Sequence, residues 1–339
     1  MQTSDAAAPT MRFEDFQAGF NWLIQRVESV LLGKTGQVRR ALLCLFAGGH
    51  LLLDDVPGVG KTTLARALAS VIEGGTTGRI QGTPDLLPSD ILGTSIFEPD
   101  TRRFTFRPGP IVANIVLFDE INRCAPRTQS ALLQAMQEHR VSTFRHEEML
   151  PDPFLVIGTQ NPQETLGTYP LPEAQLDRFL LRLTLGYPDR EAAREMLRSH
   201  GKGEGGTGGA MPIGHLRAMT AYAASVEVSD PVYDYLLDIV DATRDDREIA
   251  LGASPRAGVD LLRAARVNAL LRWQPRGDTR PYVSPDDIRD IAVDVLAHRM
   301  VLADRGKRGS AEAQRAVVSR VVNDVRVRQA VVRQGRFPG

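Results

Sequence analysis

The stretch DDVPGVGKTT at residues 54–63 constrains the fold of this chain more than any other feature. It nearly matches the phosphate-binding pattern G-x-x-x-x-G-K-[ST], with an aspartate in place of the first glycine. An apolar run, HLLLDD, leads into the stretch, and TLARALASVIEG follows with apolar residues at helical spacing. Strand, loop and helix therefore come in the order that a phosphate-binding loop requires.

The residue types in this loop suit the phosphates of a nucleotide. Backbone N–H groups curl around a phosphate in such loops, so glycine is needed where a Cβ would collide with it, at Gly58 and Gly60. Lys61 supplies a positive charge to the terminal phosphates, and Thr62 offers its hydroxyl to Mg²⁺. The residues expected to hold the nucleotide are Pro57, Gly58, Val59, Gly60, Lys61, Thr62 and Thr63.

Asp55 stands where the pattern begins with glycine. Aspartate tolerates unusual backbone angles better than most residues and bonds neighbouring N–H groups, so it is able to make the turn that glycine usually makes. A buried carboxylate that faces phosphates is costly, because like charges repel strongly away from water. We predict that the Asp55 side chain points away from the nucleotide.

Two further apolar runs end in polar residues, as expected of strands in a parallel sheet that is buried on both faces. The run NIVLFDE ends in Asp119 and Glu120, of which one suits the water shell of Mg²⁺ and the other suits an attacking water. The run FLVIGTQN ends in Asn161, whose amide is able to align a water with a phosphate. Polar residues at the end of one apolar run are also typical of a turn. Two such runs that follow the phosphate-binding loop in this order favour a nucleotide site.

Two arginines fit the same site. Arg178, in LPEAQLDRF, ends a predicted helix, where its guanidinium is expected to reach the nucleotide of a neighbouring subunit or to pair with Asp177 or Glu173. Arg256, in GASPRAG, falls in the first turn of a predicted helix that begins after Ser254, where the helix dipole disfavours a cation. A phosphate presented by the other domain is the partner that we predict for Arg256.

The chain divides into an α/β part and a helical part. Apolar strands alternate with helices at first, and after YPDR only helical patterns follow. We therefore predict domains at 1–187 and 188–339. GKGEGGTGGA at 201–210 formally contains G-x-G-x-x-G, but it follows no predicted strand and is interpreted as a flexible linker. The helices expected in the second domain span 189–200, 213–225, 231–243, 255–272, 285–301 and 311–334.

Composition argues against some classes of function. Basic and acidic residues both number 41, so the chain lacks the overall field that draws general nucleic-acid or membrane binders to their partners. Cys44 and Cys124 have no partners at metal-ligand spacing, which favours two reduced thiols without a catalytic role. The start of the sequence has no leader pattern and no apolar run reaches the length of a membrane span, so we expect a cytoplasmic protein.

Taken together, these motifs resemble those of the AAA+ ATPases, and their detailed sequences resemble those of the MoxR family within them. The resemblance covers roughly residues 15–300 and implies a P-loop αβα core with a parallel sheet, followed by a smaller all-helical lid. It also implies a homo-oligomeric ring, usually a hexamer, with ATP and Mg²⁺ held between neighbouring subunits. The motifs that carry it are GGHLLLDDVPGVGKTTLARALA, TPDLLPSDILG, FRPGPIVANIVLFDEINRCAPRTQSALLQAMQE, GTQNPQETLGTYPLPEAQLDRFLLRL and GASPRAG.

The resemblance implies a role for each motif residue. Arg178 is similar to an arginine finger that acts on the neighbouring subunit, and Arg256 is similar to the second sensor on the lid. Gln81 matches a polar residue that restrains the catalytic Glu120, and Gly82 replaces a larger apolar residue, so we expect a looser restraint. Lys61 and Thr62 match the Walker A motif, and Asp119 and Glu120 match the Walker B motif. The resemblance places Thr62 and Asp119 on the metal ion, and Asn161 matches the first sensor.

Two segments, 96–110 and 140–156, resemble hairpins of these ATPases that project toward the pore of the ring. The resemblance implies that ATP hydrolysis remodels, activates or matures a client protein in a chaperone-like way, including metal or cofactor insertion with a von Willebrand factor A-domain partner. Three alternatives stay open: a magnesium or cobalt chelatase subunit, a nucleic-acid motor, and a scaffold that binds nucleotide but hardly hydrolyses it. The neutral overall charge weighs against the motor, and the presence of Glu120 and Arg178 weighs against the scaffold.

Overall fold

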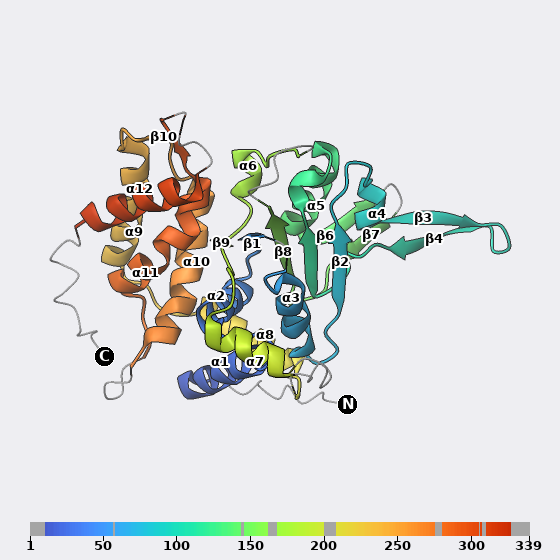
Figure 1. Cartoon of the computed structure of the whole chain (residues 1–339), viewed down its shortest axis with the longest axis horizontal. Helices are drawn as coiled ribbons and strands as arrows, with labels where there is room; N and C mark the ends of the chain where they lie inside the picture. Colours follow the sequence, from blue (N-terminus) through green and yellow to red (C-terminus); the bar gives the residue numbers. More distant parts are fainter. Residues whose placement is uncertain are drawn as a thin grey trace, which may run out of the picture.

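The computed structural model combines a sheet, covered by helices on both faces, with a group of helices beside one edge of that sheet (Figure 1). The structure describes residues 11–56, 58–143, 146–161, 168–199, 208–274, 280–304, 306 and 310–326.

The sheet has five strands, which lie in the order β2-β5-β8-β1-β9. Every neighbouring pair is parallel, as predicted for an α/β core. Parallel sheets need cover on both faces, and all residues of β1 and β5 are indeed buried. The strands are β1 (Leu51–Asp54), β2 (Thr77–Gln81), β5 (Ile115–Asp119), β8 (Leu155–Gln160) and β9 (Leu181–Leu183).

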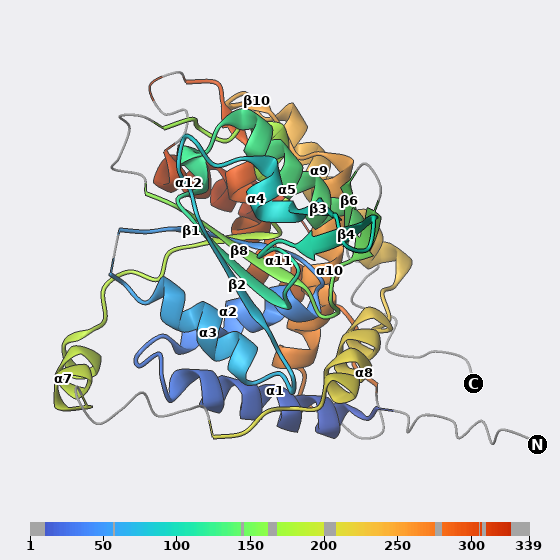
Figure 2. The same ribbon diagram turned by 90° about the vertical axis from the view of Figure 1, so that its right-hand side faces the viewer.

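Alternating side chains of the three central strands, β5, β8 and β1, enter two separate cores, because successive residues of a strand point to opposite faces. Leu51 and Leu53 of β1 join one core, and Leu52 joins the other. The first core is covered by α1 (Phe13–Glu28), α2 (Thr35–Phe46) and α3 (Lys61–Ser70), and the second by α4 (Pro88–Leu92) and α5 (Pro126–Glu138). Figure 2 shows these two helical layers below and above the sheet, which confirms the predicted αβα arrangement.

Both predicted hairpins are present as antiparallel pairs. β3 (Gly93–Glu98) pairs with β4 (Arg103–Pro108), and β6 (Arg140–Thr143) pairs with β7 (His146–Met149). The β3–β4 hairpin extends from the body of the molecule at the right of Figure 1. Phe97 and Phe104 contact each other across it in a tilted arrangement, with 5.3 Å between ring centroids, and about half of each residue is exposed.

The second half of the chain is mainly helical, as predicted. α10 (Pro255–Arg272) has the predicted bounds, whereas the helix expected over 285–301 ends at Leu296 and continues as a 3₁₀ turn, η2 (Ala297–Arg299). A small antiparallel pair, β10 (Ile249–Leu251) with β11 (Val301–Leu302), was not predicted. The other elements are α6 (Glu173–Leu176), α7 (Arg190–Ser199), α8 (Ile213–Ala224), α9 (Asp230–Asp245), α12 (Ala311–Asp324) and the 3₁₀ turn η1 (Ile121–Arg123).

The segment before α8 returns to the first half of the chain. The backbone N–H of Met211 donates to Val71 O at 2.8 Å, and Glu73 N–H donates to Met211 O at 2.9 Å. α8 then packs against α2 and α10. The domain boundary at 187/188 stays a prediction. Residues 201–207 of the predicted linker and residues 327–334 of the predicted last helix lie outside the described residues.

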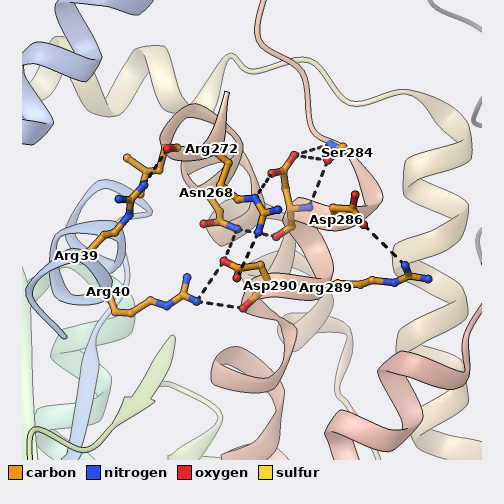
Figure 3. Close-up of polar contacts among 10 residues, drawn as sticks. Arg39, Arg40, Asn268, Arg272, Ser284, Asp286, Arg289 and Asp290 are labelled. Carbon is orange, nitrogen blue, oxygen red and sulfur yellow. Dashed lines mark hydrogen bonds and ion pairs between the residues drawn. The ribbon is translucent and has the colours of Figure 1, made fainter. Parts of the chain in front are cut away.

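Ion pairs and hydrogen bonds join α2 to the helical half. Arg39 donates to Leu271 O at 2.8 Å, and Arg40 contacts Asp290 at 3.2 Å (Figure 3). Asp290 also accepts from Asn268, which holds the carboxylate between α10 and α11 (Pro285–Leu296). The two halves are therefore fastened together on the side of the sheet that carries α2.

The surroundings of the two cysteines and the length of the helices are the structural facts that bear on the composition. Cys44 and Cys124 are free and buried, and burial raises the pKa of the Cys124 thiol to about 11. Burial likewise raises the pKa of Cys44, so both thiols stay protonated at neutral pH. Within the described part of the chain, each helix is too short or too polar to cross a bilayer.

Candidate nucleotide-binding site

The predicted phosphate-binding loop connects β1 to α3. Gly58 has a φ of 84° and Gly60 a φ of 100°, in the left-handed region that favours glycine. A Cβ on Gly58 would meet open space, whereas a Cβ on Gly60 would come within 2.9 Å of Leu31 Cδ1. The loop thus needs glycine for its backbone turn at both positions and leaves room over Gly58 for a ligand. Pro57 lies outside the described residues.

α3 begins directly at the loop, with Gly60 as its N-cap and Lys61, Thr62 and Thr63 in its first turn. The backbone N–H groups of this turn lack partners within the helix, so the positive end of α3 faces the space that the loop encloses. Lys61 Nζ donates to the backbone carbonyl of Asp55 at 3.2 Å, which holds the ammonium over the loop. Val59 is buried and anchors the loop to the core.

Asp55 does not face this space. Its carboxylate accepts hydrogen bonds from the backbone N–H groups of Leu185 at 2.5 Å and Gly186 at 3.1 Å. Both donors belong to the connection between β9 and α7. The side chain is thus turned toward this connection, as predicted, and it ties the start of the loop to the segment that leads into the helical half.

Asp54 makes a second tie that was not predicted from the sequence. It forms an ion pair with Arg182 of β9, and Arg182 Nη1 donates to Gln314 Oε1 of α12 at 3.1 Å. Burial raises the pKa of the Asp54 carboxyl, and the Arg182 charge opposes that rise. No local pattern reveals this pairing, because its three members are far apart in sequence.

The two acids at the end of β5 are held by neighbouring strands. Asp119 accepts from Thr159 Oγ1 at 3.3 Å and from Arg79 Nη2 at 3.0 Å. Glu120 has a φ of 56°, and its backbone N–H donates to the same Thr159 hydroxyl at 2.9 Å. Thr159 therefore fixes both acids, although it carried no signal in the sequence beyond its place near the end of a strand.

Gln81 contacts the second acid directly. Its Nε2 donates to Glu120 Oε2 at 3.0 Å, which is the contact expected of a residue that restrains Glu120. The next residue, Gly82, donates its N–H to Asp119 O at 2.7 Å, and a Cβ there would lie 2.1 Å from Glu120 O. This close approach runs against the expectation that Gly82 loosens the restraint.

Asn161 follows β8 at the same edge of the sheet. Gln160 is level with Asp54 of β1, and Asp55 N–H donates to Gln160 O at 3.1 Å. Asn161 is therefore positioned between the end of β5 and the loop after β1. The structure thus gathers the loop, both acids, Gln81 and Asn161 at the carboxyl ends of four adjacent strands.

The two predicted arginines lie at the amino ends of the strands, opposite the loop. Arg178 precedes β9, and it lines a cavity of about 90 Å³ together with Arg256, Arg263 and His50. His50 immediately precedes β1, whereas the loop follows β1, so the length of that strand separates both arginines from the loop. The expectation that Arg256 meets a phosphate presented by the other domain stays a prediction. Within one chain, α10 begins beside the amino ends of β1 and β9, so Arg256 does not lie beside the loop of its own chain.

Arg178 is held without an acidic partner among the described residues. Its Nη1 donates to the carbonyl of Leu133 at 2.8 Å, and the alternative ion pairs with Asp177 and Glu173 are not formed there. Burial and the nearby charge of Arg256 lower the pKa of Arg178. This edge of the molecule is therefore a concentration of positive charge that suits an anion.

Comparisons with known proteins agree with this arrangement. Residues 50–181 match the family described as "ATPase family associated with various cellular activities (AAA)", and residues 241–321 match the AAA lid domain. The chain is 41% identical over 323 residues to Chaperone MoxR1 of Mycobacterium tuberculosis, covering 92% of this chain and 84% of the relative.

Two further relatives span nearly the whole chain. The uncharacterized protein YeaC of Bacillus subtilis is 43% identical over 323 residues, which cover 93% of this chain and 96% of the relative. The crystal structure of a putative ATPase from Cytophaga hutchinsonii superposes with a TM-score of 0.82 at 34% identity, covering 94% of this chain and 97% of that one.

Proposed function

Since the chain belongs to the MoxR family of AAA+ ATPases, we propose that its subunits assemble head to tail into a ring in which two subunits complete each ATP site. One observation carries this proposal. The loop lies at the carboxyl ends of the strands, whereas Arg178 and Arg256 lie at their amino ends. A contact between unlike surfaces is heterologous, and repeated contacts of that kind form a ring when the rotation from subunit to subunit closes. We expect a hexamer.

The residues at the loop edge fit a magnesium-bound ATP. The open space over Gly58 and the free N–H groups of the first turn of α3 suit phosphate oxygens. Thr62 and Asp119 supply the hydroxyl and carboxylate oxygens that Mg²⁺ prefers beside phosphate. Mg²⁺, when bound, neutralises charge that develops on the transferred phosphoryl group. Lys61 is expected to exchange the Asp55 carbonyl for phosphate oxygens.

Within this site Glu120 is the general base. Its carboxylate takes a proton from the attacking water, and Asn161 orients that water through its amide. The hydrogen bond from Gln81 holds Glu120 in a resting position, so Glu120 becomes active when this bond breaks. The contact with Gln81 is thus a brake on hydrolysis, which ATP binding or a neighbouring subunit releases.

Arg178 and Arg256 act on the ATP of the adjacent subunit. The two guanidinium groups lie close enough for the charge of one to lower the pKa of the other, and an incoming phosphate relieves this repulsion. An arginine finger contributes about three to five orders of magnitude to the rate in measured cases. Hydrolysis therefore depends on assembly.

We assign the work of the ring to a client protein, in line with the chaperone relative and the family. Driving a partner almost completely from one of two states to the other takes about 5.5 kcal/mol, which is within reach of ATP turnover. The exposed Phe97 and Phe104 of the β3–β4 hairpin suit contacts with such a client. A von Willebrand factor A-domain protein, acting in metal or cofactor insertion, is the partner class that we propose.

A mixing experiment tests the shared site. Chains with Lys61→Ala keep the arginines but lose nucleotide binding, and chains with Arg178→Ala keep the loop but lose the finger. We expect either variant alone to hydrolyse ATP slowly and the mixture to regain activity. Glu120→Gln should bind ATP and hydrolyse it at least a hundredfold more slowly, roughly the scale of a lost general base. Wild-type rates for Glu120→Gln would contradict the assignment of the base.

A further inference from the structure

The residues that flank the two arginines are bonded to one another. Asp177 immediately precedes Arg178, and Ser254 lies two residues before Arg256. Ser254 Oγ lies 3.0 Å from both carboxylate oxygens of Asp177, to which it donates its proton. The same hydroxyl accepts from Ala257 N–H at 3.1 Å and so caps α10. One serine thus joins the start of the helix that carries Arg256 to the segment that carries Arg178.

A buried arginine completes this connection. Arg299 lies in η2, and only 1% of its side chain is exposed. Its Nη1 contacts Asp177 at 3.2 Å, and its Nη2 contacts Asp260 of α10 at 2.8 Å and the carbonyl of Phe179 at 2.8 Å. Arg299 therefore links the chain on both sides of Arg178 to the helix of Arg256.

The burial of these charges fixes their geometry. The two terminal nitrogens of Arg299 are paired with acceptors, whereas its Nε has no partner among the described residues. Unpaired buried donors are costly, and the planar guanidinium accepts only a narrow range of partner positions, so these contacts set its orientation. The charge of Arg256 contributes to the lowered pKa of Arg178, which indicates that the two guanidinium groups repel one another. The network joins α10 to the segment of Arg178 and so opposes this repulsion. Of its members, Asp260 alone also lines the cavity that both arginines line.

We infer that Asp177, Ser254 and Arg299 are positioning residues that hold Arg178 and Arg256 as one unit for the ATP of the neighbouring subunit. This inference rests on the proposed function. It implies that breaking the Ser254 contact lowers the rate of hydrolysis in a neighbour whose own loop is intact. ATP binding by that neighbour stays the same, because its nucleotide is held by the neighbour's loop.

The test uses mixed assemblies in which the two roles are separated. The acceptor chain carries Arg178→Ala and binds ATP, and the donor chain carries Lys61→Ala and supplies the arginines. Ser254→Ala is then added to the donor alone. The matched control is a donor with Ser284→Ala, because Ser284 also caps a helix of the same half and also donates to a carboxylate, that of Asp287 at 2.6 Å.

We expect the Ser254→Ala donor to lower kcat of the mixture by roughly tenfold to a hundredfold with KM for ATP unchanged, since a displacement of about 1 Å has costs of that order. The Ser284→Ala donor should match the plain donor. Ser254→Thr, which keeps the hydroxyl, should restore most of the rate. Asp177→Asn in the donor is a second variant that weakens the same contact and is expected to lower kcat in the same way.

Each other outcome has a definite meaning. If the plain donor fails to activate the acceptor, the shared site of the proposed function is wrong. If the plain donor activates and the Ser254→Ala and Asp177→Asn donors activate equally well, the shared site stands and the positioning role is overturned. Co-purification of a tagged donor with an untagged acceptor measures assembly. Loss of assembly with Ser254→Ala but not with Ser284→Ala also overturns the positioning role.

Discussion

At Gly82 the backbone passes close to Glu120, the proposed general base. A Cβ there would lie 2.1 Å from the carbonyl oxygen of Glu120, so Gly82→Ala has to push β2 and the end of β5 apart. We expect kcat to fall roughly tenfold or more, because small displacements of a general base are costly, while ATP affinity changes little. Steady-state hydrolysis and calorimetric titration with a non-hydrolysable ATP analogue measure the two effects.

Gly214→Ala in α8 is the matched control. A Cβ at Gly214 meets nothing within 4 Å, and alanine favours a helix over glycine by roughly 0.5–1 kcal/mol. We expect this variant to keep its ATPase rate and to unfold at slightly higher denaturant. Equal ATPase rates for the Gly82 and Gly214 variants would show that the close approach at Gly82 has no part in hydrolysis.

His50 provides a pH dependence. Its Nε2 lies 3.2 Å from Met136 O, and its Nδ1 accepts from Val156 N–H at 3.1 Å, so the ring is neutral. Burial lowers its pKa from 6.5 to about 3. The folded chain therefore binds fewer protons than the unfolded chain between these pH values. This part of the stability is present above pH 6.5 and is lost as the pH falls toward 3, by about 1.4 kcal/mol per pH unit.

Urea unfolding at several pH values between 7.5 and 5 measures this dependence as a slope. The buried His298, whose pKa is also lowered by burial, adds to the slope of the wild type. His50→Asn is expected to be less stable at every pH but to have a flatter slope, because one titrating group is gone. A slope identical to that of the wild type would contradict the assignment of His50.

The sequence predicted those residues whose role depends only on their near neighbours in the chain. Gly58 and Gly60 follow from the turn that the loop makes, and both have the expected positive φ. Thr159, Ser254 and Arg299 were not identified as site residues, because their partners come from segments that the sequence does not bring together. Arg256 was predicted as a functional residue, but the sequence did not predict that it lies beside Arg178 at the amino ends of the strands, for the same reason.

At the scale of elements, Asp55 couples the loop to the connection between β9 and α7. It accepts two backbone hydrogen bonds there, and hydrogen bonds to a charged group contribute about 1.5–3 kcal/mol each. Asp55→Asn keeps one acceptor oxygen and places an NH₂ group opposite a backbone N–H. We expect a loss of about 2 kcal/mol in the free energy of unfolding, measured by urea denaturation, with weaker ATP binding.

Asp189→Asn is the control for that variant. Asp189 lies in the same connection and accepts from Ala192 N–H at 2.8 Å, and among the described residues no hydrogen bond joins it to the loop. We expect a smaller loss of stability and no change in ATP affinity. A result in which both variants lose equal stability and bind ATP as the wild type does would remove the coupling role of Asp55.

The long helix α10 was predicted with its bounds, whereas the three-residue strand β9 was not predicted. α10 has 18 residues and a serine cap, so its apolar spacing repeats often enough to define both ends. β9 has three residues, and no period can be recognised in so short a run. It forms because β1 offers an unpaired edge, which is a property of the folded sheet rather than of the segment.

At the scale of the whole molecule, the two ends of the parallel strands carry different functional groups. The loop, Asp119, Glu120 and Asn161 lie at the carboxyl ends, and Arg178 and Arg256 lie at the amino ends. Neither end holds a complete set of catalytic groups. A single chain is therefore expected to bind ATP and to hydrolyse it slowly, whereas the rate per chain rises with protein concentration as rings form.

The overall charge bears on the choice between a protein client and a nucleic acid. Basic and acidic residues balance, and the exposed hairpin carries Arg102, Arg103 and Arg107 beside its two phenylalanines. If these arginines gripped single-stranded DNA, log affinity would fall against log salt with a slope of about −2, at roughly 0.7 per neutralised phosphate. We expect no such slope.

Fluorescence anisotropy of a labelled oligothymidylate between 50 and 200 mM salt tests this for the ATP-bound Glu120→Gln ring. The matched control replaces the three hairpin arginines by alanine. We expect weak or absent binding that is the same in both proteins, since the local charge is small and the exposed Phe97 and Phe104 suit an apolar protein segment. A slope near −2 that disappears in the control would instead identify the hairpin as a nucleic-acid contact, and the ring would then be a motor on DNA.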